Sequence, residues 1–194
     1  SQGPFVAYEF SGQLRRQGPR GPTLAKLEKA FGPSPAWAEA LRSSPARIEE
    51  IEAPTPDRSY SLSLVRMAST FQSPHPENNI LYARLYKPTG PVLATLLFLP
   101  MWQGRESDAE DLISRDLAQR GFRVALMPQA YQWRRSPAGI RSGSLLLSPD
   151  PGRTKDALVQ SLADAQRLSL WLSATSPSPG HKLGIMGLSL GGFA

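Results

Sequence analysis

The residues best suited to chemistry stand near the end of the chain, in the run Gly187-Leu188-Ser189-Leu190-Gly191-Gly192. It follows the apolar segment Leu183–Met186, which we expect to be a strand. Where a strand turns sharply into a helix, a serine between glycines has an exposed hydroxyl, because only glycine lets the crossing backbones come so close. A helix that starts there also directs backbone amides toward the hydroxyl. The pattern predicts that Ser189 is a nucleophile; the alternative is a glycine-rich turn with an incidental serine.

Strands and helices that would position Ser189 alternate along the chain. Tyr60–Leu64 and Ile80–Lys87 read as extended segments and fit antiparallel neighbours at a sheet edge. Val92–Leu99 is apolar throughout, as expected of a strand that helices cover on both faces. The elements that follow predict a parallel α/β sheet. The first is a helix from the capping box Ser107 to Glu110 as far as Arg120, with the apolar stripe Ala109, Leu112, Ile113 and Leu117. The strand Phe122–Met127 and the helix Thr154–Leu172 come after it.

The first 58 residues have a different composition, with prolines crowded before Asp57. Helix signals, namely a closing glycine and serine-proline starts, predict three short helices over Thr23–Phe31, Pro35–Arg42 and Pro45–Glu52. We therefore expect residues 1–58 to be a proline-rich helical extension and residues 59–194 to belong to the α/β domain.

The order of these elements resembles the α/β-hydrolase fold, in which the nucleophile follows the fifth strand in a turn called the nucleophile elbow. Lys87-Pro88 and Pro128-Gln129-Ala130-Tyr131 are similar to the dienelactone hydrolase and acetyl esterase branch. They also resemble eukaryotic-type α/β-hydrolase-domain proteins with a Pro-x-x-Tyr loop. The resemblance covers about Tyr60 to Ala194. It implies the N-terminal half of that fold: a mostly parallel sheet with antiparallel N-terminal edge strands, truncated after the fifth strand.

The resemblance also implies roles for two loops. The oxyanion-hole amides would come from the residue after the nucleophile and from the loop after the third strand, here Pro100 to Gly104. Many members have His-Gly where this chain has Pro100-Met101, and the alternative is a plain loop in which Trp102 only packs. The implied site is the nucleophile Ser189, the oxyanion-hole residues Leu190 and Trp102 (or Met101), and the elbow glycines Gly187, Gly191 and Gly192.

In this fold the triad acid and histidine follow the serine in sequence, so the resemblance places both beyond Ala194. The histidines of the chain are His75, in a proline-rich loop, and His181, at the remote end of the last strand. Neither is placed to act as the base. Because a serine without a base is a poor nucleophile at neutral pH, the chain by itself is predicted to be inactive.

The predicted function is therefore that of a serine hydrolase acting on a small-molecule carboxylic ester or related acyl substrate, in the parent protein. A non-catalytic α/β-hydrolase-fold binding or scaffolding module and a serine peptidase of the same fold are the alternatives. The chemistry needs no metal and no organic cofactor. The loop after Met127 contains Arg134, Arg135 and Arg141, which could bind an anionic substrate. The alternative is a solvated loop.

Composition limits other classes of function. The chain has no cysteine, so it can form neither a disulfide nor a thiolate metal site. Its longest apolar run, Pro91 to Trp102, is shorter than the roughly 20 residues of a membrane-spanning helix. The net charge of +6 comes from basic residues scattered among acidic ones, which does not favour nucleic-acid binding. Ser1 to Phe10 lacks the features of a signal peptide, so we expect a cytoplasmic protein.

Overall fold

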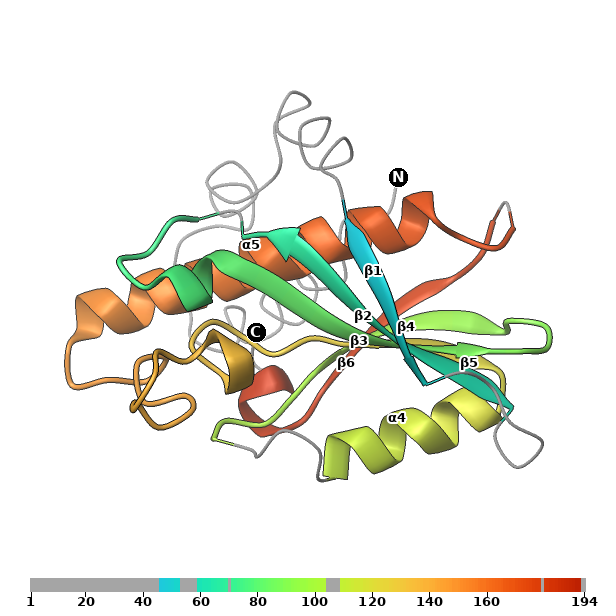
Figure 1. Cartoon of the computed structure of the whole chain (residues 1–194), viewed down its shortest axis with the longest axis horizontal. Coiled ribbons are helices and arrows are strands. Elements are labelled where there is room, and N and C mark those ends of the chain that lie inside the picture. Colours follow the sequence, from blue (N-terminus) through green and yellow to red (C-terminus); the bar gives the residue numbers. More distant parts are fainter. Residues whose placement is uncertain (1–45, 53–58, 70, 104–108, 179, 193–194) are drawn as a thin grey trace, which may run out of the picture.

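A computed structural model describes residues 46–52, 59–69, 71–103, 109–178 and 180–192. These residues form a six-stranded sheet with the order β1-β2-β3-β5-β4-β6 and two α-helices (Figure 1). The strands are β1 (Arg47–Glu52), β2 (Tyr60–Ala68), β3 (Ile80–Pro88), β4 (Ala94–Leu99), β5 (Phe122–Leu126) and β6 (Leu183–Gly187), and the helices are α4 (Ala109–Gln119) and α5 (Pro151–Ala174).

The pairing of the strands confirms the mixed sheet expected from the sequence. β1, β2 and β3 follow one another in antiparallel register, and β3 pairs antiparallel with β5. β4 lies between β5 and β6 and is parallel to both. The carboxyl ends of β4, β5 and β6 therefore meet at one edge of the sheet, where open α/β sheets bind ligands.

The two helices cover opposite faces of the sheet (Figure 1). Leu97 and Leu99 of β4 pack in a core cluster with Leu168 of α5. Phe98 lies in a second cluster that includes Ala118 of α4. Neighbouring residues of β4 thus point into different apolar layers, which explains why every residue of this strand except Thr95 is apolar. Each fully buried side chain of this kind stabilises the fold by about 1.5–3 kcal/mol.

Helix α5 begins earlier than the predicted Thr154. The Asp150 side chain accepts hydrogen bonds from the backbone amides of Gly152 and Arg153, and Pro151 occupies the first turn. Asp150 is thus an N-cap, and a proline in the first turn is well tolerated because its missing N–H would have no partner there. The helix runs for 24 residues and spans the whole length of the sheet.

The predicted helix over Pro45–Glu52 is wrong, because Arg47–Glu52 forms strand β1. β1 pairs with β2, and its register shifts between Glu50 and Glu52, which is a β-bulge. Ile48 and Ile51 are spaced as on one face of a helix, but both are about half exposed, with 58% and 48% of their surface accessible. Because β1 precedes the five predicted strands, the strand before Ser189 is the sixth along the described chain.

The predicted helices Thr23–Phe31 and Pro35–Arg42 lie outside the described residues, as does Ser107 of the predicted capping box. The division of the chain at residue 58 stays a prediction.

The buried face of α4 also differs from the predicted stripe. Ile113 and Leu117 pack against the core, but Leu112 is 68% exposed. Polar residues take its place on the buried side, since Glu110, Asp111 and Ser114 are all buried.

Asp111 is the centre of the polar contacts under α4. Its carboxylate accepts hydrogen bonds from the Tyr86 hydroxyl, from Arg84 Nη1 at 3.1 Å and from Arg115 Nε at 2.5 Å. Burial raises the pKa of the Tyr86 phenol well above its ordinary value, and the neighbouring carboxylate raises it further. Burial alone would also raise the pKa of Asp111, but hydrogen bonds from Arg115 and Tyr86 hold it below its ordinary value.

Candidate active site

Backbone strain marks the edge of the sheet where the three parallel strands end. Among the described residues, the non-glycine residues with a positive φ are Gln103, Tyr131, Trp133 and Ser189, with φ between 51° and 59°. All four lie in the loops that follow β4, β5 and β6. Such strained conformations persist only where the surroundings enforce them, and they concentrate at functional sites. We therefore take these three loops as the candidate site.

Ser189 stands at the turn where β6 ends. The strand ends at Gly187, and a 3-10 turn over Ser189–Gly192 begins at the serine itself. Ser189 has φ of 52° and is exposed. The backbone amide of Leu188 donates to the Leu99 carbonyl at 3.1 Å, which joins the turn to the end of β4.

Two glycines make this turn possible. A Cβ atom on Gly191 would lie 2.7 Å from the Leu99 carbonyl carbon and 2.8 Å from the Pro100 oxygen. A Cβ on Gly187 would lie 2.5 Å from the Gly192 nitrogen. A Cβ on Gly192, in contrast, would have its nearest neighbour at 3.5 Å, which is an ordinary contact. Close backbone approach therefore requires Gly187 and Gly191 but not Gly192.

The loop after β4 brings Met101 and Trp102 to this edge. The backbone amide of Met101 donates to Glu110 Oε1 at 2.9 Å, so it is already engaged. The indole Nε1 of Trp102 donates to the Gly143 carbonyl at 2.9 Å, and the side chain is 37% exposed. The backbone amide of Trp102 has no hydrogen-bond acceptor among the described residues. Between the two candidates from the sequence, the geometry favours the Trp102 amide as an open donor.

Leu190 follows Ser189 in the chain, and its side chain is half-buried. Its side chain packs against the small apolar cluster that includes Tyr131, Leu146 and Ala157. The turn that carries Ser189 is therefore in contact with the loop after β5 and with the start of α5.

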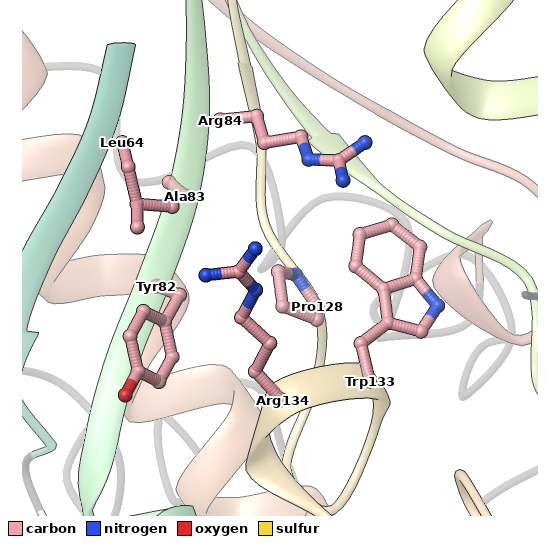
Figure 2. Close-up of a pocket in the computed structure, with 7 residues that line it drawn as sticks. All are labelled: Leu64, Tyr82, Ala83, Arg84, Pro128, Trp133 and Arg134. Carbon is pink, nitrogen blue, oxygen red and sulfur yellow. The ribbon is translucent and has the colours of Figure 1, made fainter. Parts of the chain in front are cut away.

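The structure corrects the interpretation of the arginines in the loop after β5. Arg135 is not solvated and does not face a substrate, because its side chain is fully buried and Nη2 lies 2.6 Å from Asp164 Oδ2. Arg134 lines a hollow of only about 10 Å³ beside Trp133 and Arg84 (Figure 2), which is too small for a substrate. Arg141 is exposed.

Neither histidine of the described residues contacts Ser189. His181 Nε2 lies 2.9 Å from Thr95 Oγ1, before the amino end of β6, whereas Ser189 follows its carboxyl end. A five-residue strand separates these two ends by roughly 16 Å. The ring of His75 packs edge-on against Tyr131, with centroids 5.7 Å apart, beside a hollow of about 600 Å³ that also borders Asp156 and Gln160 of α5.

No role is predicted from the sequence for two buried glutamines in the loop after β5. The Gln129 side chain is fully buried, and neither its oxygen nor its nitrogen has a partner among the described residues. Gln132 is also fully buried, and its side chain bonds the backbone of Met101. Their burial depends on how the two loops meet, and the local sequence does not reveal it.

No protein-family model matches the chain, and no curated protein matches its sequence. Among solved structures, the chain is similar to an acetyl xylan esterase from Paenibacillus sp. R4, with 16% sequence identity and a TM-score of 0.57. The match covers 93% of this chain and 57% of the esterase chain. The chain is also similar to acetyl xylan esterase 1 from Thermoanaerobacterium sp. JW/SL YS485, with 18% identity, 88% and 56% covered, and a TM-score of 0.51.

The chain has the α/β-hydrolase fold. At these identities the likeness concerns the fold alone. The chain spans a little over half the length of the two esterases. Within the described ranges, no helix has the length and hydropathy that would let it span a membrane. The same ranges contain no cluster of three or more side chains suited to binding a metal ion.

Proposed function

We propose that this chain carries the nucleophile and the oxyanion donors of a serine hydrolase that acts on carboxylic esters or related acyl compounds. The observation that carries the proposal is the conformation of Ser189, which is exposed, has a positive φ and starts a turn pressed against the end of β4. The likeness to two acetyl xylan esterases supports an acyl substrate.

The proposed chemistry follows from the groups at this edge. The Ser189 hydroxyl attacks the acyl carbonyl, and the proton passes to a histidine base that a carboxylate orients. The negative oxygen of the tetrahedral intermediate accepts hydrogen bonds from the amides of Leu190 and Trp102. One such donor is worth about 10²–10³ in kcat. The alcohol leaves, and water then releases the acyl group from Ser189.

The base and the acid are proposed to lie outside the described residues, following Ser189 in the sequence. Without them the hydroxyl stays protonated and is a weak nucleophile. We therefore expect the 194-residue chain alone to be inactive, and a longer product of the same gene that includes both groups to be active.

A fluorophosphonate probe that reacts with activated serines tests the proposal. On the longer product we expect one labelled peptide, containing Ser189, and no labelling of Ser189→Ala. Ser173→Ala is the matched control, because Ser173 is an exposed serine near the end of α5, and it should be labelled normally. Labelling that survives in Ser189→Ala would disprove the role of Ser189.

A non-catalytic binding module is the second candidate, and one observation favours it. His75 packs on Tyr131 and His181 lies beside Thr95, so neither histidine of the described residues stands next to the Ser189 hydroxyl. Absence of labelling in a longer product that folds would support this module and exclude both the esterase and the peptidase.

A further inference from the structure

A buried glutamine joins the loop after β5 to the loop after β4. Gln132 is fully buried, and its Nε2 donates to the Met101 carbonyl at 2.8 Å. Its Oε1 accepts from the backbone amide of Gln129 at 3.0 Å. One end of the side-chain amide faces an acceptor and the other faces a donor. The orientation of this amide is therefore fixed, since a flipped amide would set oxygen against oxygen.

The Met101 carbonyl belongs to the same peptide group as the Trp102 amide. A trans peptide is planar, so its C=O and N–H point in opposite directions, and no cis peptide occurs among the described residues. Holding the Met101 carbonyl therefore sets the direction of the Trp102 N–H. This N–H is the one that has no acceptor among the described residues.

Contacts on both sides hold the residues next to this peptide in place. The preceding amide, that of Met101, donates to Glu110 at 2.9 Å, and the Trp102 indole donates to Gly143 at 2.9 Å. The next residue, Gln103, is already strained, with φ of 58°. Of these partners, only Gln132 contacts the Met101–Trp102 peptide group itself.

Gln132 is in turn held by a rigid loop. Its backbone amide donates to the Gln129 carbonyl at 3.2 Å, and its carbonyl accepts from the Arg135 amide at 2.9 Å. The Arg135 side chain is anchored in the core, 2.6 Å from Asp164. The position of the Gln132 side chain is therefore fixed by the buried core of the domain.

We propose that Gln132 is a positioning residue, which orients the Met101–Trp102 peptide so that the Trp102 N–H points toward the oxygen of the reacting acyl group. The inference rests on the proposed function, because it assigns the oxyanion donor of that same site. Gln132 itself does not touch the substrate. Its removal lets the peptide rotate, which weakens stabilisation of the transition state more than binding of the substrate.

The substitution Gln132→Glu tests this with a change of few atoms. An ionised glutamate still accepts from Gln129, but it places a negative oxygen against the Met101 carbonyl. A protonated glutamate donates to that carbonyl again. In the longer product, which includes the base and the acid, we expect the rate of Ser189 labelling and kcat at about pH 8 to fall by about 10–100-fold with little change in KM. Relative to the unchanged protein at each pH, the loss should shrink as the pH is lowered.

The matched control is Gln119→Glu, the same change at an exposed position near the end of α4. This variant should change neither the rate of Ser189 labelling nor kcat at any pH. Labelling of Gln132→Glu equal to that of the control, together with normal labelling of Gln132→Met, overturns the proposal, because a buried glutamate that stays protonated still donates to the Met101 carbonyl. So does a loss of the same size at every pH, because a merely structural defect would not respond to protonation of the new carboxyl group. If Gln132→Glu does not fold, Gln132→Met removes the donor without adding a charge. A normal labelling rate in that variant overturns the proposal.

Amide hydrogen exchange and the amide NMR shift of Trp102 separate this inference from the proposed function. If the unchanged protein is not labelled at all, the proposed function fails. The Trp102 amide then still decides whether Gln132 orients it. An altered shift and faster exchange in Gln132→Glu, but not in Gln119→Glu, support the positioning role, and an unaltered amide refutes it.

Discussion

The substitution Gly191→Ala provides a direct test of the turn at Ser189. Ordinary contacts of a Cβ atom begin near 3.4 Å, but a Cβ here would lie 2.8 Å from the Pro100 oxygen and 2.7 Å from the Leu99 carbonyl carbon. The turn must then move away from the end of β4 by at least about 0.7 Å, the difference between 3.4 Å and 2.7 Å, because backbone atoms cannot rotate aside as a side chain can. We expect a loss of about 1–3 kcal/mol in the free energy of unfolding, as for other overpacked sites.

The substitution should also lower the reactivity of Ser189. The displacement stretches the 3.1 Å hydrogen bond between the Leu188 amide and the Leu99 carbonyl, and so moves Ser189 relative to the loop after β4. Misplacement of a reacting group by about 1 Å can cost 10²-fold in rate. We therefore expect fluorophosphonate labelling of Gly191→Ala to fall by about 10–100-fold under conditions in which the protein is still folded.

Gly192→Ala is the matched control for this experiment. It adds the same methyl group one residue later, where the nearest atom would be 3.5 Å away. Denaturant unfolding measures the stability of both variants, and the rate of probe labelling measures the reactivity of Ser189. Equal stability and equal labelling of the two variants would refute the claim that close backbone approach at Gly191 holds Ser189 in place.

Three further predictions concern the framework. Asp164→Asn should lower the free energy of unfolding by about 3–5 kcal/mol, because it leaves the buried Arg135 charge uncompensated; a loss under 1 kcal/mol in denaturant unfolding would contradict this. The lowered pKa of Asp111 predicts a stability contribution that is complete above about pH 4, the unfolded value, and is lost as the pH falls through the lower folded pKa. The difference in the free energy of unfolding between the unchanged protein and Asp111→Asn should therefore become smaller only at acidic pH. A difference that does not depend on pH would contradict this prediction. Asp150→Ala should cost about 1 kcal/mol, because it removes the cap of α5; unchanged thermal melting would speak against the cap.

Much of the sheet could be predicted because its elements have local signals. The largely apolar run of β4 predicts a strand covered on both faces, and the glycines around Ser189 predict a close approach of two backbone segments. β1 was missed because Ser44-Pro45 has the pattern of a helix start, and the spacing of Ile48 and Ile51 also fits one face of a helix. Pairing with β2 decides the conformation of this segment, and a partner elsewhere in the sequence leaves no local trace.

The candidate site could be predicted only in part for the same reason. A serine between glycines is a local pattern, whereas the use of a backbone amide depends on which neighbour has already engaged it. Glu110 engages the Met101 amide, and Gln132 engages the Met101 carbonyl from another loop. The charge of Arg135 suggested a surface position, because the sequence does not show that Asp164 lies beside it.

The buried ion pair between Arg135 and Asp164 also has a consequence for the order in which this protein is made. Asp164 lies 29 residues after Arg135 in the chain. At about 5–20 residues per second, a ribosome needs roughly 1.5–6 s to synthesise the segment between them. During that interval the Arg135 guanidinium has no carboxylate to receive it. The loop that holds Gln132 can therefore settle only after α5 has emerged, so the last part of the domain to become ordered is the part proposed to carry its chemistry.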